Sequence, residues 1–200
     1  MIVLAGVISL LALAAVVVSL GYLHLEPTGL SPVRNAVSQY GITSFRAGYR
    51  VATIAFGLSG VALASGVDRA VSGRGRSLVV GLLVVFAAAR FAIGWFPMDA
   101  PGAARTQTGQ THGLLALFAF ASATIAAFRL GGVLSQEQRW HSLATVSTAL
   151  GFAMAACLVG LGLARSIPAA RTRFGAIERG FYVSAIAWFA VFSFACAVRP

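Results

Sequence analysis

The chain has 200 residues, of which 58% are hydrophobic and only 10% are charged. A soluble domain carries about 25% charged residues, so this composition excludes a soluble globular fold. The 15 basic residues are all arginine and outnumber 5 acidic residues, which gives a net charge of +10. Most arginines lie in short segments between apolar runs, a distribution typical of membrane topology signals and headgroup contacts rather than of nucleic-acid binding.

Six apolar runs follow one another along the chain, and each is close to the roughly 20 residues that cross a bilayer as an α-helix. They are continuously apolar, whereas the strands of a membrane barrel alternate. The sequence therefore predicts an all-α polytopic membrane protein, a single bundle of six transmembrane helices that forms one domain over residues 1–200. The expected helices cover residues 2–23, 45–65, 77–96, 112–130, 140–164 and 177–198.

Residue choice inside the runs predicts how the helices pack and where they end. Ala119, Ala123 and Ala127 recur at four-residue spacing in the fourth run. Small residues at this spacing let helix backbones approach closely, which favours a tight bundle within one chain. Trp95 and Trp140 lie at run ends, where we expect the indole rings to anchor the helices at the membrane interface.

The connections between the runs are of two kinds. Residues 66–76 and 129–139 are short, Gly-rich, charged turns, whereas residues 24–44, 97–111 and 165–176 contain proline and further polar side chains. With six spanning helices, the three richer connections all lie on one side of the membrane. We call this the loop side, and the side with the two short turns the turn side.

The arginine counts on the two sides do not fix the orientation. The turn side carries Arg69, Arg74, Arg76, Arg129, Arg139 and Arg199, and the loop side carries Arg34, Arg46, Arg105, Arg165, Arg171, Arg173 and Arg179. Six against seven is no bias under the positive-inside rule. The dense basic turn at residues 66–76 is of the cytoplasmic kind, so we expect a multi-pass protein of the cell membrane with both termini cytoplasmic.

Ionisable side chains gather toward the loop side. Arg90 and Arg50 lie inside apolar runs, where a charge costs about 2.5–3.5 kcal/mol at a helix centre and usually has a partner or lines a cavity. The candidate acid–base residues are Asp99, His112 and Glu178, and the candidate substrate-binding residues are Glu26, Arg34, Arg50, Arg90, Trp95 and Arg179. Two interpretations fit this cluster: an ion-pair network that joins the carboxylates to the buried arginines, or a polar pocket that opens on the loop side.

No pattern indicates a metal or a cofactor. His24 and His112 fall on the loop side and His141 on the turn side, without the spacing of a zinc site. Cys157 and Cys196 lie in apolar runs, where we expect them to pack as small buried hydrophobic residues. We therefore expect no cofactor and no metal.

Three segments carry a family resemblance: "NAVSQYG", "GWFPMDAPGAARTQTGQTHG" and "FGAIERGFY". In this order on six helices, the chain resembles the membrane family known as domain of unknown function 998. The motifs of that family match Ser38 and Gly41, then Phe96, Pro97 and Asp99, then His112 and Gly113, then Glu178 and Arg179. Gln39 stands where the family pattern has an acidic residue. The resemblance implies a helical bundle with a shared polar face and no known reaction.

These observations predict an integral membrane protein whose loop-side pocket, lined by Arg, carboxylate and His side chains, binds or acts on a lipid or isoprenoid-like substrate by acid–base chemistry. One alternative is a non-catalytic accessory protein that binds a lipid or small molecule. Another is a small-solute transporter, although the inverted repeats and broken helices typical of transporters are not evident. The expected partners are membrane lipids and an amphipathic or anionic lipid-like ligand, without nucleic acid. The sequence leaves open the oligomeric state and whether the protein is an enzyme.

Overall fold

The computed structural model describes residues 1–198, so Arg199 lies outside the described residues. Six helices are long and apolar enough to cross a membrane: α1 (Ile2–Leu25), α2 (Arg46–Ala70), α3 (Arg76–Ile93), α4 (Gln107–Leu134), α5 (His141–Ser166) and α7 (Phe174–Val198). Two short elements lie in the loop-side connections: the 3-10 helix η1 (Val37–Ile42) and α6 (Pro168–Arg171). The predicted all-α bundle of six transmembrane helices is confirmed.

The third helix ends earlier than the hydropathy pattern predicts, and the fourth helix begins earlier. α3 stops at Ile93, before Gly94 and the proline at position 97 that disfavours helix for the residue preceding it. α4 begins at Gln107 because Thr106 caps it: the Thr106 hydroxyl accepts a hydrogen bond from the backbone N–H of Gly109 at 3.0 Å. The Thr and Gln residues expected in the loop therefore form the first turn of a helix.

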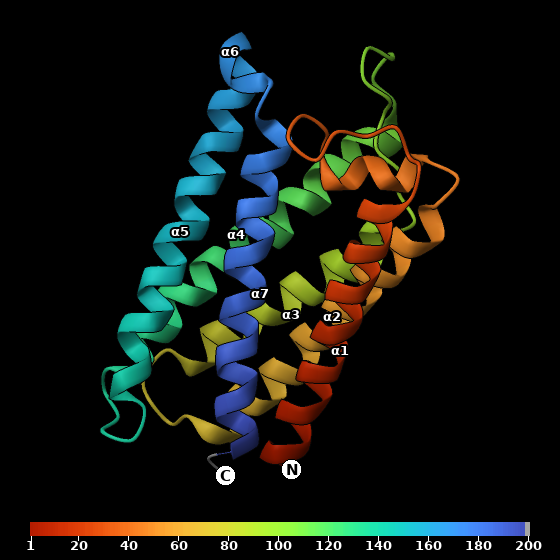
Figure 1. The fold of residues 1–200 in the computed structure, drawn as a ribbon. Helices are drawn as coiled ribbons and strands as arrows, with labels where there is room; N and C mark the ends of the chain where they lie inside the picture. Colours follow the sequence, from red (N-terminus) through yellow and green to blue (C-terminus); the bar gives the residue numbers. More distant parts are fainter. Residues whose placement is uncertain (199–200) are drawn as a thin grey trace.

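The six long helices form a ring in sequence order. Each packs against the next, and α7 closes the ring between α1 and α5 while also touching α2 and α4. Figure 1 shows both termini at one end of the bundle, with η1, α6 and the three longer connections at the other. The structure thus places the three polar connections on one side, as the helix count predicts.

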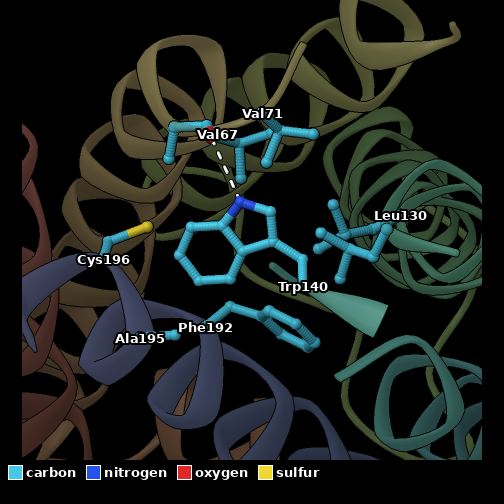
Figure 2. A pocket seen from close by; sticks show the side chains of 9 residues that line it. Val67, Val71, Leu130, Trp140, Phe192, Ala195 and Cys196 are labelled. Atoms are coloured by element: carbon cyan, nitrogen blue, oxygen red, sulfur yellow. Dashed lines mark hydrogen bonds between the residues drawn. The ribbon is translucent and has the colours of Figure 1, made fainter. Parts of the chain in front are cut away.

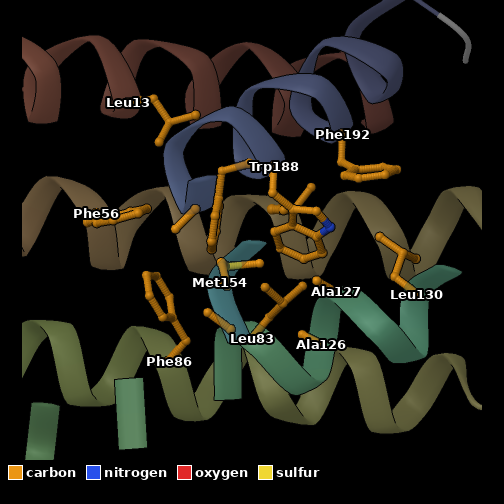
Figure 3. Close-up of a cluster of buried hydrophobic side chains, with 14 of the residues drawn as sticks. Leu13, Phe56, Leu83, Phe86, Ala126, Ala127, Leu130, Met154, Trp188 and Phe192 are labelled. Atoms are coloured by element: carbon orange, nitrogen blue, oxygen red, sulfur yellow. The ribbon is translucent and has the colours of Figure 1, made fainter. Parts of the chain in front are cut away.

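Aromatic rings and small residues fill the interior of the bundle (Figure 3). Phe56 lies edge-on to Phe86 at 4.9 Å and to Phe189 at 5.1 Å between ring centroids, which joins α2, α3 and α7. Ala123 and Ala127 of the predicted small-residue stripe are 0% exposed. The alanines allow α4 to approach its neighbours closely, and dispersion contacts between helices replace the hydrophobic effect as the packing force in lipid.

Hydroxyl groups tie α1, α2 and α7 together on the turn-side half of the bundle. Ser193 donates to Ser9 at 2.6 Å, and Ser9 lies 2.8 Å from the Ser59 hydroxyl. Gly6 allows this contact, because a Cβ there would lie 2.5 Å from the backbone oxygen of Ser193. Any side chain at position 6 would therefore force α1 and α7 apart.

Trp140 does not anchor at the membrane interface as its position at a run end predicts. It is 3% exposed, and its indole N–H donates to the backbone oxygen of Ala70 at 3.2 Å. Figure 2 shows the ring among Leu130, Phe192 and Cys196, around a small apolar hollow. The C-terminal carbonyls of a helix lack partners within the helix, and the indole supplies one for α2. Trp95, by contrast, is 57% exposed.

Candidate functional site

The connection between α1 and α2 covers the loop-side end of the bundle, and Arg179 holds it there. The Arg179 guanidinium donates to the backbone oxygens of Pro32 at 2.7 Å and Asn35 at 2.8 Å. It also donates to His24 Nε2 at 2.8 Å and to the Tyr40 hydroxyl at 3.3 Å. Arg179, which is predicted to bind substrate, therefore donates its hydrogen bonds to other residues of the chain.

Glu178 lies directly beneath this connection. Glu178 is only 6% exposed, and its Oε2 accepts a hydrogen bond from the backbone N–H of Val37 at 2.7 Å. The first N–H groups of a helix have no partner within it, so the carboxylate caps η1 from a helix 141 residues further along the chain. Adjacent residues of α7 thus fix two points of the same connection.

Arg90, near the end of α3, is only 2% exposed. Its Nη1 donates to the Tyr182 hydroxyl at 3.0 Å, and its guanidinium carbon lies 5.3 Å from the Phe56 ring centroid. Its Nε is buried without a hydrogen-bond partner, and Arg90 forms no ion pair within the described residues 1–198. The C-terminal end of α3 carries partial negative charge, which offsets only a fraction of the cost of burying the cation.

Tyr49 supplies a second buried polar group without a partner. It is 3% exposed, and no described residue hydrogen-bonds with its hydroxyl. Tyr49, Tyr182 and Glu178 all lie within electrostatic range of Arg90. We call Tyr49, Arg90, Glu178 and Tyr182 the buried polar centre.

The two tyrosines were not among the predicted site residues. Tyr182 lies four residues after Glu178, so both occupy one face of α7, and this spacing could have identified it. Tyr49 directly precedes Arg50 in α2, and no sequence pattern distinguishes it from an interfacial tyrosine. Arg50 itself turns away from the centre: its Nε donates to the Gly94 oxygen at 3.0 Å and its guanidinium covers the Trp95 ring at 4.7 Å.

Asp99 and His112 lie together at the start of α4. The Asp99 carboxylate accepts from the Thr106 hydroxyl at 2.6 Å and from the Thr106 N–H at 3.1 Å. The hydroxyl bond, then the backbone bond, holds the pKa of Asp99 below its ordinary value. His112 is 6% exposed, and its Nδ1 lies 2.7 Å from the Phe96 oxygen. A carbonyl only accepts, so Nδ1 carries the proton and Nε2 is the basic nitrogen.

The predicted site residues therefore fall into separate groups. His112 lies within electrostatic range of both Arg90 and Asp99, but its hydrogen bond goes to the backbone oxygen of Phe96. Glu26 lies beside Tyr22 at the end of α1, and Arg34 is exposed. Within residues 1–198, neither Asp99 nor Glu178 forms an ion pair with Arg50 or Arg90, so the expected ion-pair network is not formed.

The structure also bears on the predicted pocket. The apolar hollow around Trp140 and a more polar hollow beside Arg74 both lie on the turn side. Neither is lined by a predicted site residue. The loop-side pocket stays a prediction.

Fold and polar residues together define a multi-pass membrane protein with an uncompensated arginine inside its helical bundle. A family model described as protein of unknown function (DUF998) matches residues 7–195. The chain belongs to this family, in agreement with the three motifs that indicate it. No curated protein and no solved structure matches the chain.

Proposed function

We propose that this membrane protein binds the anionic head of a lipid- or isoprenoid-like amphiphile at the buried polar centre. The observation that carries the proposal is Arg90, which is 2% exposed and has no carboxylate within ion-pair distance in residues 1–198. A charge taken out of water costs several kcal/mol unless an anion and hydrogen bonds compensate it. Ionisable residues inside membrane spans accordingly mark binding sites and substrate paths.

The chemistry of the centre favours an acceptor-rich head group. Arg90 Nε–H and the Tyr49 hydroxyl are both buried donors without an acceptor among the described residues. A carboxylate or phosphate provides several oxygens and suits the fork of a guanidinium. The Phe56 ring adjoins Arg90, and with the Phe86 ring that packs against it would supply an apolar surface for a hydrocarbon tail.

The acid–base version of the proposal assigns roles to three residues. Glu178 and His112 both lie within electrostatic range of Arg90 and would exchange protons with a bound substrate. Asp99 interacts with His112 and would act through it. The six long helices are uninterrupted within residues 1–198, so no observation favours a transporter over a binding protein or an enzyme.

The binding test compares Arg90→Met with the matched control Arg173→Met. Arg173 is an exposed arginine on the same side, before α7. Protein freed of lipid is mixed with farnesyl phosphate or with neutral farnesol, and the intact complex is measured by mass spectrometry. We expect the wild type and Arg173→Met to retain the phosphate compound and Arg90→Met to lose it. Equal retention by Arg90→Met, or equal retention of farnesol, contradicts the proposal.

A second experiment separates catalysis from binding. Glu178→Gln keeps an acceptor for the Val37 N–H and removes the titrating group, so the cap over the centre remains. The amphiphiles that copurify with the wild type and the variant from the same cells are identified by mass. An enzyme that uses Glu178 accumulates an unconverted species in the variant. Identical species in both proteins contradict the acid–base role and favour the accessory binding protein.

A further inference from the structure

A second group of arginines lies on the turn side, at the opposite end of the bundle from the buried polar centre. A hollow of about 160 Å³ opens there between the α2–α3 turn and α4. It is lined by Arg74, Phe128, Arg129, Gly132, Val133 and Gln136. The lining combines two cations with apolar side chains, at the end of a membrane-spanning helix.

The two arginines in this hollow differ from their neighbours in having no internal partner. Arg76 pairs with Asp68 at 3.4 Å, and Arg69 donates to the preceding turn of α2. The side chains of Arg74 and Arg129 make no hydrogen bond or ion pair with any residue in the described range 1–198. Both guanidinium groups are exposed and have all their donors available.

The backbone beneath them is held in place. The backbone N–H of Arg74 donates to Gln136 Oε1 at 3.2 Å, and the Gln136 amide donates to the Gly132 oxygen at 2.9 Å. Glu137 accepts from the N–H groups of Ser72 at 2.6 Å and Gly73 at 2.8 Å. The α2–α3 turn is thus fixed to the end of α4, which lowers the ordering cost of binding a ligand between them.

We propose that this hollow binds the phosphate group of an anionic phospholipid from the leaflet on the turn side. Arg74 and Arg129 would each direct a guanidinium fork to the phosphate oxygens, while Phe128 contacts the apolar part of the same molecule. Basic pockets between transmembrane helices bind acidic head groups in this way. The opening lies beside Gly132, where a Cβ would meet nothing within 4 Å.

The charge test removes both cations. Full-length protein freed of lipid is titrated with phosphatidylglycerol or with phosphatidylcholine of the same acyl chains, and bound lipids are counted by mass spectrometry of the intact complex. We expect one phosphatidylglycerol to bind the wild type roughly thirtyfold more tightly than the Arg74→Gln/Arg129→Gln variant. Each of the two arginines contributes a similar factor to the affinity for an anionic lipid, and the two factors multiply. The control Arg69→Gln should bind like the wild type. No preference for phosphatidylglycerol, or equal binding by the double variant, overturns the proposal.

The shape test leaves both charges in place. Gly132→Phe puts a ring into the hollow and should abolish the tight phosphatidylglycerol site. Gly81→Phe in α3 is the matched control, because a Cβ at Gly81 also meets nothing within 4 Å and Gly81 does not line the hollow. Retention of the tight site in Gly132→Phe overturns the assignment to this hollow.

A competition experiment distinguishes a lipid from a soluble phosphate compound. Glycerol 3-phosphate or inorganic phosphate is added at millimolar concentration to the complex with phosphatidylglycerol. We expect the lipid to remain bound, because the apolar contacts with Phe128 add to the phosphate contacts. Displacement by the soluble compounds overturns the lipid assignment. Arg90→Met leaves this hollow intact, so the outcome is independent of the site proposed on the loop side.

Discussion

Arg76 and Arg90 lie near the two ends of the same helix, α3, and meet opposite conditions. The Arg76 side chain is 39% exposed and pairs with Asp68 at 3.4 Å. Arg90 is 2% exposed and reaches only a tyrosine hydroxyl and aromatic faces. Water and a nearby carboxylate satisfy the first cation, whereas the second is buried without an anion in residues 1–198. The exposed arginine on the turn side is therefore compensated, whereas the buried one on the loop side retains an electrostatic cost.

The largest expected difference comes from removing each charge in protein freed of lipid. Arg90→Met should raise the free energy of unfolding by about 1–4 kcal/mol, because an apolar side chain of similar size replaces an unpaired buried cation. Arg76→Met should change it by less than about 1 kcal/mol, as for other exposed ion pairs. Thermal unfolding in detergent measures both. A clear loss of stability in lipid-free Arg90→Met would show that the bundle compensates the charge by itself.

The tyrosines of the buried polar centre sharpen the comparison. Tyr182→Phe removes the hydroxyl that Arg90 contacts at 3.0 Å and should cost about 1.5–3 kcal/mol, the usual value for a hydrogen bond to a charged group. Tyr49→Phe removes a buried hydroxyl without a partner and should stabilise lipid-free protein by about 1 kcal/mol. With farnesyl phosphate bound, Tyr49→Phe should instead lose stability relative to the wild type. A loss in the lipid-free state would mean that the Tyr49 hydroxyl serves the fold.

Asp99 gives a smaller, pH-dependent effect on the exposed part of the loop side. Its pKa is lowered from 3.8 by the two bonds from Thr106, so its stabilising contribution is complete above that ordinary value and is lost as the pH falls through the lowered one. The protection of the first amides of α4 against hydrogen exchange, taken relative to the intrinsic exchange rate at each pH, should fall below about pH 4 in the wild type. Asp99→Asn should start from faster exchange and show no such pH step. A step of equal size in Asp99→Asn would assign the transition to another group.

The last prediction locates the two sides in the cell. Reporter fusions after Ser72, on the turn side, and after Ala103, on the loop side, are expected to report cytoplasmic and external positions respectively. The dense basic turn at residues 66–76 carries this prediction. A cytoplasmic signal at Ala103 would reverse the orientation and place the buried polar centre nearer the cytoplasm.

The segment from Gly94 to Gly113 shows how far sequence reasoning reaches within one connection. Its two prolines and its polar residues predict a turn, and Asp99 and His112 are predicted to lie on the same face of the protein. The structure brings the two residues within electrostatic range, but their hydrogen bonds go elsewhere. The Asp99 carboxylate accepts from Thr106, and His112 Nδ1 lies against the Phe96 oxygen. Which partner a polar side chain chooses depends on capping and on backbone groups that hydropathy does not describe.

The sequence by itself determines the six spanning helices and the common side of the three polar connections. Both follow from the length of the apolar runs and from the parity of crossings, which are local or topological properties. Only the tertiary structure decides that Glu178 caps η1, that Arg179 fixes the first connection and that Trp140 is buried. The contacts of Glu178 and Arg179 with the first connection join residues at least 139 positions apart. Such contacts depend on how the helices are arranged around α7, which no run of neighbouring residues encodes.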